Sequence, residues 1–212
     1  YDLVNIGTNH DITVPADGAC ASINFTGTAS SINVSTGKTL SVTGAVTLNS
    51  YNDNAFTSAT ITGLGTLNAG TLNIGLASVL NSTANSENAL TLNIAALNVT
   101  GDFTIYNNDE GGGDANEPRV TINSPCVLSA NKLALIQTGN GNGNGGSRII
   151  TFNANSGATV NLSGGTNPIS ISSQTSLETG KVVFNINSGS TFNYSGSVAQ
   201  TIPASISNSG SG

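Results

Sequence analysis

Carboxylates are concentrated in one stretch of the sequence, NNDEGGGDANE, which runs from Asn107 to Glu117. Its acidic residues are Asp109, Glu110, Asp114 and Glu117. Carboxylate and amide oxygens on a loop are ligands that Ca²⁺ accepts, so these four residues are the calcium candidates. Their spacing fits neither the EF-hand nor the calcium-binding nonapeptide of β-rolls, and a solvated loop tip is the alternative. Calcium is the one cofactor that the sequence leaves open, and otherwise we expect none.

The sequence offers little material for catalysis. His10 is the single histidine, and neither a nucleophile elbow nor a paired cysteine accompanies it. The glycine-rich stretch from Gly139 to Gly146 lacks the Lys-Ser/Thr of a phosphate loop and opens no helix. We therefore expect a protein that is not an enzyme.

Three aromatic residues, Tyr51, Phe56 and Tyr106, fall on or beside long polar segments. Exposed aromatic rings can stack on sugar rings, so these residues are the candidates for glycan binding. The alternative is that they anchor their loops against the body of the protein.

Composition excludes several classes of partner. Only 8% of the 212 residues are charged and the net charge is −6, against about 25% charged residues in ordinary soluble domains. Five Lys and Arg residues form no basic patch, which argues against nucleic acid and anionic membranes. The apolar runs are too short to span a bilayer, so we expect no membrane insertion. Because the chain opens on Tyr1 without an initiator Met, we expect it to be processed or excised from something longer.

The stretch from Ala89 to Asn107, ALTLNIAALNVTGDFTIYN, alternates apolar and polar residues as three short strands would. Similar patterns recur about every 30 residues, which is typical of stacked coils. The first series is Ile6, Val34, Ile61, Leu92, Ile122, Phe152 and Phe184; the second is Ile12, Leu40, Leu67, Leu97, Val127, Val160 and Phe192; the third is Ile23, Val46, Leu72, Phe103, Leu133, Ile169 and Ile202.

These series predict an all-β fold, a right-handed three-sided parallel β-helix (β-solenoid) of about seven coils of ~30 residues. We expect a single β-helix domain over 1–207 and a flexible Gly/Ser tail over 208–212. Gly44, Gly70 and Gly101 mark tight corners, where we expect left-handed backbone angles. No capping helix is apparent at either end, so the end coils should be open edges.

The corner after the third series is predicted to carry the long loops, aligned as one ridge. Outward positions hold Thr, Asn and Ser, which can hydrogen-bond from coil to coil. A strict Thr-x-Thr face, which would indicate ice binding, is missing. Cys20 and Cys126 should lie about four coils, or roughly 19 Å, apart, too far for an intramolecular disulfide. Half-buried thiols and a bond between chains are the remaining alternatives.

Three segments carry a resemblance to a known group of proteins. They are VPADGACASINFT from Val14, INVSTGKTLSVTGAVTLNS from Ile32 and STFNYSGSVAQTIPA from Ser190. They resemble the β-strand-repeat regions of large secreted surface proteins of Bacteroidetes-type bacteria, which are adhesin-like chains with right-handed β-helix segments. The resemblance implies an extracellular protein at the bacterial cell surface.

Together these observations favour a non-catalytic structural or adhesive component of a bacterial extracellular surface protein or fibre. Its partners would be copies of itself or adjoining β-helix segments, joined by stacking of open end coils. The alternative is a carbohydrate-binding module that uses the third-corner loop ridge, with glycans as its partners.

Overall fold

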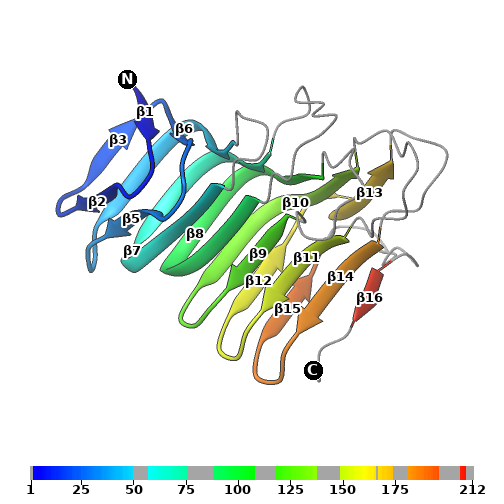
Figure 1. The fold of residues 1–212 in the computed structure, drawn as a ribbon. Helices are drawn as coiled ribbons and strands as arrows, with labels where there is room; N and C mark the ends of the chain where they lie inside the picture. Colours follow the sequence, from blue (N-terminus) through cyan, green and yellow to red (C-terminus); the bar gives the residue numbers. More distant parts are fainter. Residues whose placement is uncertain are drawn as a thin grey trace.

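A computed structural model describes residues 2–49, 57–75, 88–107, 118–137, 149–165, 167–173, 181–195 and 206–208. Within these ranges every regular element is a β-strand and every strand pair is parallel. Figure 1 shows the strands stacked in chain order, with the two termini at opposite ends of the stack. The predicted all-β class and parallel β-solenoid are confirmed. The number of coils, the three-sided cross-section and the right hand stay predictions.

Parallel pairing links the strands into three ladders. Ladder one joins β2 (Asp11–Val14), β5 (Ser30–Val34), the starts of β7 (Thr57–Ile74) and β8 (Asn88–Asn107), β9 (Arg119–Ile122), β11 (Ile149–Ala154), β14 (Lys181–Ile186) and β16 (Ile206–Asn208). Ladder two joins β3 (Gly18–Cys20), the start of β6 (Thr39–Leu48), the middles of β7 and β8, the start of β10 (Val127–Gln137), β12 (Thr159–Leu162) and β15 (Thr191–Tyr194). Ladder three joins β1 (Leu3–Ile6), β4 (Ser22–Phe25), the ends of β6, β7, β8 and β10, and β13 (Ile169–Ser173).

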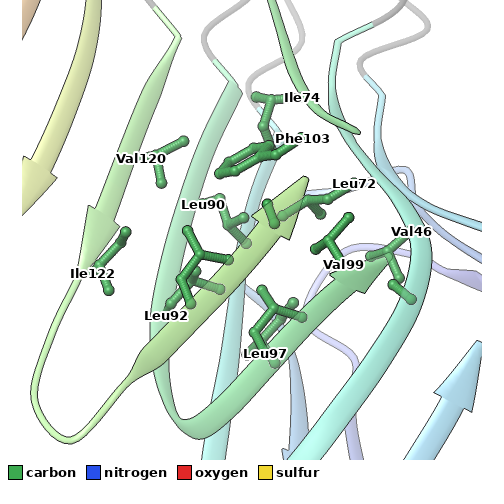
Figure 2. Packing of buried hydrophobic residues seen from close by; sticks show 14 of the residues in the cluster. Val46, Leu72, Ile74, Leu90, Leu92, Leu97, Val99, Phe103, Val120 and Ile122 are labelled. Atoms are coloured by element: carbon green, nitrogen blue, oxygen red, sulfur yellow. The ribbon is translucent and has the colours of Figure 1, made fainter. Parts of the chain in front are cut away.

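The interior is a continuous aliphatic column. In β8 the buried residues alternate with half-buried ones, as expected of a strand with one face turned inward. Figure 2 shows Leu92, Leu97 and Phe103 of this strand pointing into the space that the ladders enclose. All three side chains are fully buried. Because the polar residues between them face outward, each rung of the solenoid contributes its apolar side chains to one shared core.

The third predicted series is confirmed over the described residues. Ile23 pairs with Val46, and the same row continues through Leu72, Phe103, Leu133 and Ile169. Ile202, its last predicted member, lies outside the described residues. β16 includes Asn208, the first residue of the segment predicted as a tail.

The first and second predicted series are wrong at their starting residues. Ile6 pairs with Phe25 in ladder three, and Ile12 pairs with Ile32 in ladder one. The first coil contains short strands in close succession, so equal spacing assigns its apolar residues to the wrong ladders. Gly18, rather than Ile12, is in register with Leu40.

The predicted pairing also slips at later rungs. Val127 faces outward with 37% of its surface exposed, while Leu128 is fully buried and in register with Leu97. Alternation cannot distinguish two adjacent apolar residues, and the prediction of Val127 is wrong. The prediction aligned Phe152 with Ile122, but Phe152 pairs with Val120, two residues earlier. The prediction also aligned Val34 with Ile61, but the residue that pairs with Ile61 is Ile32, again two residues earlier. A slip of two residues keeps the same face inward and leaves the hydrophobic pattern unchanged.

The glycines at the corners between ladders two and three are close-approach positions. A Cβ at Gly44 would lie 2.8 Å from the Ala21 carbonyl oxygen, at Gly70 2.7 Å from that of Thr43, and at Gly101 2.8 Å from that of Gly70. None of the three has a positive φ. The expected left-handed angles are therefore wrong, and the stacked backbones themselves exclude a side chain here.

Candidate functional site

Most of the residues predicted to bind ligands fall, in the sequence, between the end of a ladder-three strand and the start of the next ladder-one strand. Tyr51 and Phe56 fall outside the described residues. So do the calcium candidates Asp109, Glu110, Asp114 and Glu117. Their roles in glycan and calcium binding stay predictions.

Tyr106 is the one predicted binding residue that the structure describes. It lies near the end of β8, is half-buried, and pairs with Ile136 of β10. Its backbone carbonyl oxygen would lie 3.1 Å from a Cβ placed on Gly75, in the rung before it. Tyr106 is thus built into ladder three with part of its surface exposed.

Titratable groups do not converge on a catalytic arrangement in the described ranges. Nδ1 of His10 lies 2.8 Å from the backbone oxygen of Thr8, a contact within its own exposed turn. Among the described residues, no three His, Cys, Asp or Glu side chains are placed to hold a metal ion. The same part of the chain contains no helix long and apolar enough to cross a membrane.

Asparagine side chains form hydrogen-bonded rows on the outer surface, as the polar outward positions predicted. One row crosses four rungs: Nδ2 of Asn123 donates to Oδ1 of Asn93 at 2.7 Å, Asn155 donates to Asn123 at 2.6 Å, and Asn187 donates to Asn155 at 2.7 Å. Shorter rows join Asn98 to Asn68, Asn185 to Asn153, and Asn193 to Asn161. Each amide donates toward the preceding rung, so the rows give the stack a fixed direction and satisfy these polar groups without charge.

The two ends of the solenoid differ from its middle. β1, β2 and β3 each pair on one side, as do β13 and β15 at the other end. In these outer rungs Ile6, Cys20 and Ile169 are buried, but several other core-facing residues are only partly buried, in contrast to the sealed interior of β8. They are Val4, Ile12 and Val14 at the amino-terminal end, and Ile171, Phe192 and Tyr194 at the carboxy-terminal end. Over the described residues, each end therefore presents a strand edge beside a half-exposed apolar surface.

Cys20 and Cys126 are both buried free thiols. Cys20 begins a row of ladder two that continues through Val42, Ala69 and Val99 to Ala130. Ala130 belongs to β10, the strand that follows Cys126, so four rungs separate Cys20 from this strand. Burial raises the pKa of both thiols, and that of Cys126 from 9.0 to about 12. At neutral pH both are therefore protonated and act as small apolar core residues.

The stability of the protein should fall when alkaline pH deprotonates the unfolded Cys126. The folded pKa of about 12 lies above 9.0, so the folded state holds this proton more tightly. The resulting stability is fully present below pH 9.0 and is lost as pH rises toward 12. Between pH 8 and pH 11, the free energy of unfolding should fall by about 3 kcal/mol more in the natural protein than in Cys126→Ala. Urea unfolding of both proteins at the two pH values measures this difference, and parallel losses would contradict it.

The pairing and the packing define a parallel β-solenoid with polar rows outside and an aliphatic column inside. Comparison of the chain with protein-family models, with curated proteins and with solved structures finds no match.

Proposed function

We propose that this protein is a non-catalytic structural or adhesive component of an extracellular fibre or surface protein, assembled by end-to-end stacking of solenoids. The observation that carries the proposal is the state of the two ends, where, among the strands that the structure describes, edges paired on one side adjoin partly buried apolar side chains. A strand edge whose N–H and C=O groups are unpaired pairs readily with another strand. The partner that fits best is another parallel solenoid rung, from a second copy or an adjoining segment.

The resemblance to Bacteroidetes-type adhesin-like repeats supports an extracellular location at the bacterial cell surface. The chemistry of the described surface agrees with a structural role, since its asparagine rows consist of uncharged amides. Such rows could continue across a junction: Asn187 and Asn193, in the last described rungs of their rows, donate Nδ2 to the preceding rung, so Oδ1 of each is the acceptor that a following rung would use.

Contact between the amino-terminal end of one copy and the carboxy-terminal end of another is heterologous, and because it adds copies along the axis of the stack it should extend as an open filament. We expect the natural protein to form rods whose mass rises with concentration. Val14→Glu should block the amino-terminal end and Tyr194→Glu the carboxy-terminal end, because each places a carboxylate in a core-facing position of an outer strand. Each variant alone should remain monomeric.

An equimolar mixture of the two variants provides the decisive measurement. Each partner retains one functional end, so the mixture should form dimers and nothing larger in analytical ultracentrifugation. Thr191→Glu, on the outward face of the same strand as Tyr194 but outside the asparagine rows, is the matched control and should still form rods. A natural protein that stays monomeric at high concentration, or a mixture without dimers, would contradict end-to-end stacking.

A further inference from the structure

A hollow lies on the outer face of ladder three near the amino-terminal end. It is open to solvent, has a volume of about 210 Å³, and is lined by Leu3, Ser22, Ile23, Asn24, Ala45, Thr47 and Asn49. We call it the β4–β6 hollow. Ser22, Asn24, Ala45 and Thr47 face outward, because they alternate with the buried residues Ile23, Val46 and Leu48. In-register pairs across β4 and β6 fix their positions.

Two residues that line this hollow each have a buried amide atom without a partner. Asn49 is only 2% exposed, and its Nδ2 finds no hydrogen-bond acceptor among the described residues. Oδ1 of Asn24 is also buried and accepts no hydrogen bond from them, while Nδ2 of Asn24 makes only a long contact of 3.5 Å with Asn5. A buried polar atom without a hydrogen-bond partner destabilises the folded state. Native proteins usually satisfy such atoms with ordered water or a ligand.

The lining residues specify the chemistry of an occupant. Asn49 offers a donor and Asn24 an acceptor, and the hydroxyls of Ser22 and Thr47 can act as either. None of the lining residues is ionisable, so a charged ligand would lose its water without gaining an opposite charge. Hydroxyl groups fit best, because each one donates and accepts a hydrogen bond.

The size and the apolar part of the lining narrow the ligand further. The volume of 210 Å³ is below the range of about 300 to 1,000 Å³ typical of sites for drug-sized molecules. It therefore suits one small unit rather than an extended chain. Leu3, which is 57% exposed, and Ala45 give the hollow an apolar side. A pyranose ring combines hydroxyls at its rim with an apolar C–H face, and it matches both parts.

We propose that the β4–β6 hollow binds one neutral sugar residue, and that the side-chain amides of Asn49 and Asn24 turn toward it so that one sugar hydroxyl bridges Nδ2 of Asn49 and Oδ1 of Asn24. The apolar face of the ring packs against Leu3 and Ala45. The site uses the outer face of ladder three, whereas stacking uses strand edges and core-facing side chains, and it includes none of Tyr51, Phe56 and Tyr106. It would give a fibre one glycan contact for each copy of the chain.

Titration of the full chain with D-glucose, D-galactose and N-acetyl-D-glucosamine, followed by ¹H–¹⁵N correlation spectra, tests the proposal. At least one sugar should cause saturable shifts of the side-chain amide signals of Asn24 and Asn49. Asn24→Ala should weaken binding about three- to tenfold, because it removes one hydrogen-bond acceptor. Ala45→Phe should abolish saturable shifts by filling the hollow.

Ser170→Phe is the matched control, since Ser170 lies on the outer face of the same ladder four rungs beyond Thr47. It should leave the titration unchanged. The spectrum of each variant without sugar shows whether that variant is folded. If Ala45→Phe is unfolded, the titration of Asn24→Ala alone tests the proposal. Shifts that fail to saturate with all three sugars, or binding that Asn24→Ala leaves intact, would overturn the proposal. The first of these results would mean that ordered water alone satisfies the two amides.

Discussion

Replacing Phe152 by alanine is expected to lower the free energy of unfolding by about 3 to 5 kcal/mol. Phe152 is fully buried in ladder one, and its ring forms the centre of an aromatic cluster. The ring centroids of Phe184, Phe103 and Phe192 lie 5.3, 6.3 and 6.4 Å away. Alanine would remove the transfer free energy of the ring and leave a cavity among side chains fixed by parallel strands above and below.

The predicted loss of stability depends on the complete burial of Phe152, so a less buried phenylalanine of the same cluster provides the comparison. Phe192 belongs to the same cluster but lies in the outer strand β15 and is only partly buried. Phe192→Ala should therefore cost clearly less, because part of its surface already contacts solvent. Urea unfolding followed by circular dichroism compares the two variants with the natural protein. Equal losses would show that the carboxy-terminal rungs are sealed as tightly as the interior.

The aliphatic column itself is predictable from the sequence because burial imposes a period of two on every strand. Alternation places Leu92, Leu97 and Phe103 in the interior, and all are fully buried. The three strands expected between Ala89 and Asn107 form one continuous strand, β8. Its corners appear only as register shifts against β7, after Gly63 and after Ala69. Corners this tight interrupt the pairing without ending the extended backbone, so composition marks them weakly.

Alternation of apolar and polar residues does not predict which residues pair between strands that lie about 30 residues apart in the sequence. The Asn93, Asn123, Asn155 and Asn187 row illustrates the limit, since its members are obvious only when the rungs are aligned. Single asparagines in this sequence are too common to single out those four. Their hydrogen bonds arise from the register, which is set by apolar packing on the opposite face.

The β4–β6 hollow escapes sequence reasoning for a related reason. Its lining comes from β1, β4, β6 and the residue after β6, which no local pattern brings together. Asn49 directly follows the fully buried Leu48, and a polar residue at the end of a core strand is typical of the start of a loop. Its burial, together with the missing partner of its amide, distinguishes it from an ordinary loop residue.

Gly63→Ala is expected to lower the free energy of unfolding by about 2 to 5 kcal/mol, because two separate costs combine at this corner. Gly63 has a φ of 106°, a region that side chains with a Cβ rarely adopt. A Cβ here would also lie 2.1 Å from the carbonyl oxygen of Val34, in the preceding rung. Backbone atoms cannot rotate away as a side chain can, so the rungs would have to separate locally.

Two other glycines separate these costs experimentally. Gly37 has a φ of 67°, and a Cβ at this residue would meet no atom within 4 Å, so Gly37→Ala should show backbone strain alone, about 1 to 2 kcal/mol. Gly65 has no positive φ, but its Cβ would lie 2.5 Å from the carbonyl oxygen of Ser35, so Gly65→Ala should show the steric cost alone, about 1 to 3 kcal/mol. If stacking of rungs sets the requirement for glycine, urea unfolding should rank Gly63→Ala as the most destabilised of the three variants. A Gly63→Ala protein no less stable than Gly37→Ala would mean that neighbouring rungs yield at this corner, and that the close approach of their backbones contributes little to the fold.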